Sequence, residues 1–183
     1  RVMGIYQIEA LIGFVKKHKL ANKISITWYG GEPLLAIDVM RRFLCDLRET
    51  GKELVRHDII TNGYHFNQEA IEFFSEFPLD TIQVTLDGNK ARHDSIRYNY
   101  CTGEGSFDKI IGNMERILTL LPDAFLSVRV NIDKNSQPQF MEVKNLLTNK
   151  WKDFSNFEVY PGIIRIDNEA GSDFANNGMK VSD

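Results

Sequence analysis

Apolar side chains recur at three- and four-residue spacing in five stretches of the chain, and a short apolar run rich in β-branched residues follows each stretch. The first pattern is typical of amphipathic helices and the second of strands. Helices are therefore predicted over 5–18, 38–49, 67–77, 106–121 and 138–149, and strands over 24–29, 55–61, 81–86, 124–132 and 156–160. Regular helix–strand alternation joins parallel strands by right-handed crossovers. We expect the α/β class, as an open sheet or part of a β/α barrel, and we favour the partial barrel with about five parallel strands.

Two segments interrupt this alternation. Residues 88–105 are polar and are predicted to form a long loop, which in a compact domain is often functional. Residues 167–183 are rich in Asn, Gly, Ser and Asp, and are predicted to be a polar tail or linker after one domain over 1–166. Three side chains are placed to cap the helices that follow them: Asp38, Asn67 and Ser106.

Composition indicates an ordinary soluble globular protein. Of the 183 residues, 43% are hydrophobic and 26% are charged, and the formal net charge is −3. No apolar run approaches the roughly 20 residues that cross a membrane, and no signal peptide precedes the first predicted helix, so a cytoplasmic location is expected. The acidic balance argues against a nucleic-acid partner. The basic run from Lys16 to Lys19 is predicted to be a solvated helix end.

The two cysteines lie far apart and belong to no metal-spaced group. Cys45 falls among Phe43, Leu44 and Leu47 in a predicted helix, and we expect it to be in the core. Cys101 falls in the predicted loop and is expected to be exposed. Because an iron–sulfur cluster ordinarily takes three or four thiolates, these two cysteines do not hold one by themselves.

Polar and glycine residues follow three predicted strands in succession. They are Gly30-Gly31-Glu32, Thr61-Asn62-Gly63 and Thr85-Leu86-Asp87-Gly88. Active sites of β/α barrels are built at the carboxyl ends of the strands, so the sequence predicts a polar small-molecule site at one rim.

These motifs carry a resemblance to a known family. The ordered set Tyr29-Gly30-Gly31-Glu32-Pro33-Leu34, Thr61-Asn62-Gly63, Thr85-Leu86-Asp87-Gly88, His93-Asp94, Arg97 and Gly103 to Asp108 spans residues 24–132. In this set the chain resembles radical S-adenosylmethionine (SAM) enzymes, in particular the peptide- and protein-modifying branch with anaerobic sulfatase-maturating enzymes and SPASM-type maturases. The resemblance implies reductive cleavage of SAM by a [4Fe-4S] cluster and hydrogen abstraction from a peptide or protein substrate.

The resemblance also implies roles for single residues. Gly30 and Gly31 would offer backbone carbonyls to the SAM ammonium group, while Glu32 would supply charge or anchor the loop. Thr85 would bond the ribose or carboxylate of SAM, and Arg97 would pair with that carboxylate. Tyr29 would border SAM or be a plain core aromatic residue, on the opposite face of its strand from Trp28. Two further residues are left open: Asn62 lines the site or shapes the turn before Gly63, and Asp87 contributes to the site or only shapes the turn with Gly88.

The polar loop has a plainer interpretation as well. His93 and Asp94 would then cap a short helical turn, and Arg97 would form a surface ion pair that contributes little to stability. Phe107 is predicted to pack in the core.

The family's cluster motif, Cys-x3-Cys-x2-Cys, does not occur in this sequence, nor does a C-terminal cysteine-rich domain. We therefore expect a fragment that is inactive by itself, with the cluster ligands elsewhere in the intact protein. A missing neighbour would leave the strand over 24–29 with an unpaired edge, which predicts self-association.

Two alternatives remain open. An aldolase or epimerase barrel would more often carry a catalytic lysine on a strand, whereas here only Lys134 lies just past one. A degenerate module without a cluster would keep the pocket for SAM-like or peptide ligands.

Overall fold

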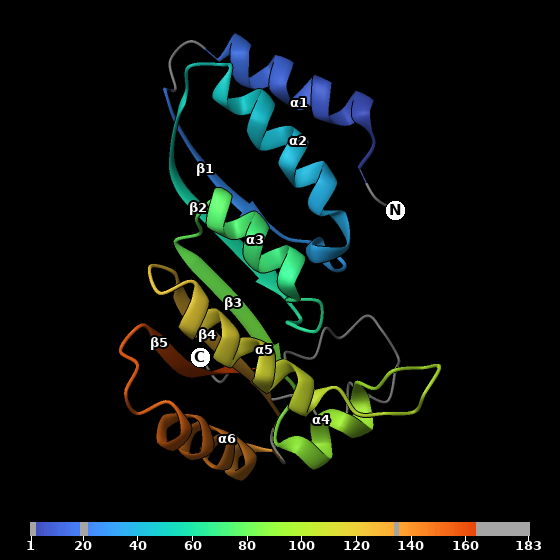
Figure 1. Cartoon of the computed structure of the whole chain (residues 1–183). Coiled ribbons are helices and arrows are strands. Elements are labelled where there is room, and N and C mark those ends of the chain that lie inside the picture. The colour runs from blue at the N-terminus through green and yellow to red at the C-terminus, as the bar shows by residue number, and fades with distance from the viewer. Residues whose placement is uncertain (1–2, 19–21, 134–135, 164–183) are drawn as a thin grey trace, which may run out of the picture.

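A computed structural model describes residues 3–18, 22–133 and 136–163. Five parallel strands form one open sheet in chain order, as Figure 1 shows: β1 (Lys23–Trp28), β2 (Glu53–Thr61), β3 (Thr81–Leu86), β4 (Phe125–Ile132) and β5 (Phe157–Ile163). Helix α1 (Ile5–Lys17) precedes β1. The helices between the strands are η1 (Pro33–Ala36), α2 (Ile37–Arg48), α3 (Gln68–Glu76), α4 (Lys90–Ile96), α5 (Phe107–Leu120) and α6 (Gln137–Lys150). The predicted α/β class and helix–strand alternation are confirmed.

The sheet has one apolar face and one polar face. Ile82, Val84 and Leu86 of β3 are fully buried against the helices, whereas Gln83 and Thr85 alternate with them and are partly exposed. Strand β4 repeats this pattern, with Val128 buried and Arg129 on the other face. Successive side chains of a strand point to opposite sides, so the helices cover only one face of the central strands.

The main core lies between the apolar face and the helices. Helix α5 buries residues at three- and four-residue spacing, among them Ile110, Met114 and Ile117. Each large apolar side chain buried in this way contributes about 1.5–3 kcal/mol of transfer free energy. A second, smaller cluster of Ile8, Ile12 and Leu47 packs α1 on α2. The core therefore holds the carboxyl ends of the strands in a defined order.

The structure confirms one of the predicted helix caps and corrects other local predictions. Asn67 does cap α3 by accepting from Ala70 N at 3.0 Å. Asp38 does not cap α2, because that helix begins one residue earlier, after Ala36. Ser106 occupies the N-cap position of α5 without a capping hydrogen bond from its side chain. The loop predicted over 88–105 is wrong in part, since it contains α4.

The prediction that Cys45 lies in the core is wrong. The residues of α2 that face the core are Ile37, Met40, Leu44 and Leu47, and Cys45 is exposed. One step along a helix rotates the side chain by about 100°, which turns Cys45 away from the face shared with Leu44. Cys101 is exposed and Phe107 is buried, as predicted.

Three predictions fall outside the described residues: the polar tail over 167–183, the end of the domain at residue 166, and Lys134. Among the helices that are described, none is long and apolar enough to span a membrane.

Candidate functional site at the carboxyl ends of the strands

The carboxylate of Glu32 ties the end of β1 to the end of β2. Its Oε1 accepts from Thr61 Oγ1 at 2.6 Å and from Leu34 N at 3.1 Å, and its Oε2 accepts from Asn62 N at 2.9 Å. The bond to Leu34 also caps η1. With these acceptors in use, Glu32 anchors the loop, which is one of the two roles considered for it.

The two glycines before Glu32 leave open space beside the backbone. A Cβ added to Gly30 or Gly31 would meet nothing within 4 Å, and Gly30 has a φ of 152° that L side chains rarely adopt. Tyr29 is 78% exposed, so it is not a core residue. Trp28 faces the helices instead, where its Nε1 donates to His57 Nε2 at 2.7 Å. A ligand can therefore approach this loop from the solvent side.

Asn62 shapes the next strand end and also lines a cavity. Its Oδ1 accepts from Tyr64 N at 2.8 Å, while the left-handed conformation belongs to Gly63, with φ of 76°. Of the two roles left open for Asn62, the turn role thus takes the form of a side-chain hydrogen bond, while Gly63 supplies the left-handed backbone. Asn62 and Arg97 line the same cavity of about 340 Å³, together with Tyr64, Tyr98, Tyr100 and parts of α4 and α5. The end of β2 thus meets the loop after β3 at one cavity.

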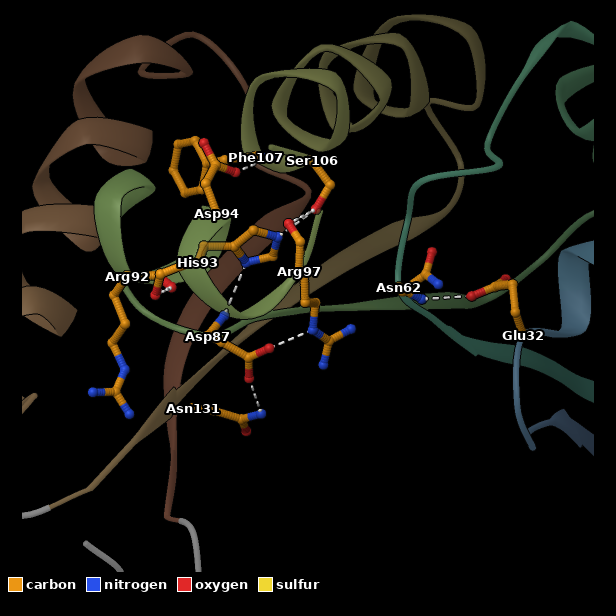
Figure 2. A network of polar contacts seen from close by, with 11 residues as sticks. Glu32, Asn62, Asp87, Arg92, His93, Asp94, Arg97, Ser106, Phe107 and Asn131 are labelled. Atoms are coloured by element: carbon orange, nitrogen blue, oxygen red, sulfur yellow. Dashed lines mark hydrogen bonds and ion pairs between the residues drawn. The ribbon is translucent and has the colours of Figure 1, made fainter. Parts of the chain in front are cut away.

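Asp87 holds Arg97 at the end of β3. Arg97 Nε donates to Asp87 Oδ2, and Asn131 Nδ2 donates to Asp87 Oδ1 at 2.7 Å (Figure 2). Asp87 is only 8% exposed, so this ion pair is not the surface ion pair considered above. Asp87 also does more than shape a turn. Figure 2 shows the two terminal nitrogens of Arg97 pointing away from Asp87, which leaves them free for a ligand.

His93 joins the two ends of the same loop by hydrogen bonds. Its Nδ1 accepts from Asp87 N at 3.1 Å, its Nε2 lies 2.9 Å from Ser106 Oγ, and Ser106 Oγ donates to Arg97 O at 3.0 Å. Since Nδ1 is an acceptor, the proton of the neutral ring is on Nε2. Burial lowers the pKa of His93 below 6.5. His93 therefore acts as a neutral link between the two ends of the loop.

His93 and Asp94 do not cap the short helix α4, contrary to the plainer interpretation of the loop. Asn89 caps α4 by accepting from Arg92 N at 3.2 Å. Asp94 Oδ1 instead accepts from Phe107 N at 2.9 Å, across the loop at the start of α5. Helix α4 had not been placed in the sequence, so its cap was assigned four or five residues too late.

The remaining predicted residue, Thr85, lies on the polar face of β3 beside Arg129 of β4. Asn131, which the sequence analysis missed, joins the network from β4. It lies near the end of the fourth strand, so the rule that found the three earlier motifs also applies to it. Within the described ranges, no group of three or more Cys, His, Asp or Glu side chains is placed to hold a metal ion.

Residues 1–147 match the family model of the Radical SAM superfamily. The chain belongs to this superfamily. The solved structure of native anSMEcpe with bound AdoMet, an anaerobic sulfatase-maturating enzyme, matches this radical SAM chain with a TM-score of 0.73 and 20% identity. The match covers 98% of this chain and 47% of that one. At this identity the likeness concerns the fold, which is that of a partial radical SAM barrel.

Two further relatives extend the comparison. anSMEcpe with bound AdoMet and Kp18Cys peptide matches with a TM-score of 0.73 at 20% identity, over 98% of this chain and 48% of that one. The uncharacterized protein MJ0804 of Methanocaldococcus jannaschii is 27% identical over 95 residues, which are 52% of this chain and 30% of that protein. The radical SAM chain thus spans about half the length of the solved chains, and less of MJ0804.

Proposed function

We propose that this chain is the SAM-binding part of a radical SAM enzyme that acts on a peptide or protein substrate, in the manner of a sulfatase maturase or another peptide maturase. The observation that carries the proposal is the pairing of Arg97 with Asp87, which leaves the terminal nitrogens of Arg97 free at a cavity that Asn62 also lines. A guanidinium held by its Nε presents a planar fork to a carboxylate.

The residues present fit the methionine end of SAM. The open space beside Gly30 and Gly31 would let their carbonyls accept hydrogen bonds from the ammonium group, and Glu32 fixes this loop to β2. Arg97 would hold the carboxylate, and the hydroxyl of Thr85 would bond that carboxylate or the ribose. Tyr29 and Asn62 would border the bound molecule.

Bound beside a reduced [4Fe-4S] cluster, SAM would be cleaved reductively and would supply the radical that abstracts a hydrogen atom from the substrate. The contribution of this chain is to orient SAM and to limit access of water. The cluster itself does not fit Cys45 and Cys101, because the first lies on the outer face of α2 and the second on the loop between α4 and α5. We propose that its ligands lie in another part of the intact protein, and that the protein works in the reducing cytoplasm.

The first experiment is a titration of the ¹⁵N-labelled chain with SAM, followed by NMR at the amides of Gly30, Gly31 and Asn62. Saturable shifts at these three positions are expected. Arg97→Gln should weaken SAM binding by roughly tenfold or more, because a hydrogen bond to a charged group contributes about 1.5–3 kcal/mol. Adenosine lacks the methionine part, so its binding should not depend on Arg97.

Glu53→Gln is the matched control for Glu32→Gln, since Glu53 is exposed at the opposite end of β2. Glu32→Gln should weaken SAM binding and Glu53→Gln should not. A chain that does not respond to SAM, or an Arg97→Gln variant that binds it as well as the unaltered chain, would refute the proposal. The upstream gene sequence tests the cluster separately: three cysteines at Cys-x3-Cys-x2-Cys spacing are expected there.

A further inference from the structure

Arg129 is a charged side chain without a counter-ion among the described residues. It lies in the middle of β4 on the polar face of the sheet and is only partly exposed. Its Nε is buried and has no hydrogen-bond partner in the described part of the chain. A guanidinium stays charged at any physiological pH, so it does not escape an unfavourable environment by losing a proton. A buried donor of this kind indicates that an acceptor is missing.

The acidic neighbours of Arg129 already have partners. Glu158 Oε1 accepts from Ser127 Oγ at 2.8 Å, and Asp87 is bonded to both Arg97 and Asn131. Tyr160, directly beside Arg129 on β5, donates its hydroxyl to Gln83 Oε1 at 2.9 Å. These groups bond to one another, and no described group accepts a hydrogen bond from Arg129 or forms an ion pair with it.

Gly162 on β5 leaves the space that the side chain of Arg129 occupies. A Cβ added to Gly162 on β5 would collide with Arg129 Nε and would come within 2.8 Å of Arg129 Cγ. The side chain of Arg129 thus lies against the backbone of β5, in space that only a glycine leaves open. Arg92, whose Nε is also buried and unbonded, differs because it forms an ion pair with Asp133.

Arg129 lies deeper on the polar face than Asn131, and directly beside Thr85, the deepest of the proposed SAM-binding groups. The strand register places Thr85, Arg129 and Tyr160 in one row, and Asn131 and Gly162 two residues closer to the carboxyl ends, where Asn131 Nδ2 donates to Asp87. Two residues along a strand correspond to about 6.5–7 Å. Arg129 is therefore one row away from Asn131, the strand residue that joins the network holding Arg97.

We propose that Arg129 binds a carboxylate of the peptide substrate, as a specificity-determining residue for an acidic side chain near the modified position. This inference rests on the proposed function, because it takes SAM to be the molecule at Arg97. It adds a second anion site, with a planar guanidinium that recognises carboxylates.

The test titrates the full chain with two peptides, acetyl-Ala-Glu-Ala-amide and acetyl-Ala-Gln-Ala-amide, and follows the side-chain Nε–H signal of Arg129 by NMR. The Glu peptide is expected to shift this signal in a saturable manner and to bind roughly tenfold more tightly than the Gln peptide. Arg129→Gln should abolish the preference, and Gly162→Ala should weaken it by displacing the guanidinium. Arg56→Gln is the matched control, because Arg56 lies on the same face and is paired with Asp58.

Equal binding of both peptides, or a preference that survives Arg129→Gln, would overturn the inference. SAM binding is measured on the same variants. Arg97→Gln should lose SAM affinity, and Arg129→Gln should keep it within about twofold. If Arg129→Gln loses SAM affinity as Arg97→Gln does, the anion at Arg129 is the carboxylate of SAM and this inference is wrong. If the unaltered chain does not bind SAM, the proposed function fails. The peptide titration still shows whether Arg129 binds a carboxylate.

Discussion

The imidazole of His93 occupies a fully buried position between Asp87 N and Ser106 Oγ. Burial is the main cause that lowers its pKa below the ordinary value of 6.5. The unfolded chain then binds more protons than the folded chain at pH values just below 6.5. The stability that His93 contributes is therefore present above about pH 6.5 and is lost as the pH falls through the folded-state pKa.

Urea unfolding between pH 7.5 and 5 checks this linkage. The free energy of unfolding of the unaltered chain should fall as the pH decreases below about 6.5. His93→Gln should be less stable at pH 7.5 by about 1–3 kcal/mol, because the hydrogen bonds of a buried group are changed. Its stability should depend less on pH, and part of the slope should remain because burial also lowers the pKa of His57. A slope unchanged by His93→Gln would contradict this role.

At the scale of elements, the start of α5 depends on a residue of α4. Asp94 accepts from Phe107 N, and a Cβ at Gly105 would collide with the carboxyl group of Asp94. Burial raises the pKa of Asp94, but the hydrogen bonds from Phe107 N and Lys90 lower it by more, so its pKa is lowered overall. The ionised carboxylate thus joins the two helices beside the loop that carries Arg97.

A double-mutant cycle tests this connection. Asp94→Asn should cost about 1 kcal/mol, as the loss of a helix cap does, and Gly105→Ala about 1–2 kcal/mol because it displaces Asp94. In the Gly105→Ala background, Asp94→Asn should cost less than about 0.5 kcal/mol. Additive effects would show that the two residues act independently. Gly112→Ala is the control: it lies in the interior of α5 with open space around it, and should stabilise the chain by about 0.5–1 kcal/mol.

At the scale of the whole molecule, the sheet has two edge strands. In the described part of the chain, β1 is hydrogen-bonded only to β2, and β5 only to β4. Unpaired backbone groups along an edge strand are a template for pairing with another chain. Self-association through β1 therefore stays a prediction.

Light scattering after size-exclusion chromatography is the measurement for this prediction. The average mass should exceed 21.0 kDa and should rise with protein concentration. Thr27→Lys places a charge at an exposed position of β1 and should return the mass to that of the monomer. Thr119→Lys, on the exposed side of α5, makes the same chemical change away from the edge and should have no effect. Monomeric behaviour at all concentrations would rule out the β1 interface.

The sequence by itself determined the helix–strand alternation, the α/β class and the position of polar motifs after three strands. These features follow from residue periodicity, which is a local property of the chain. Only the tertiary structure decided that Arg97 pairs with Asp87, that Glu32 joins β1 to β2, and that Cys45 faces outward. Asp87 and Asn131 are 44 residues apart, and their hydrogen bond exists because β3 and β4 lie side by side. Strand order sets such partners, and it is not encoded in a local pattern.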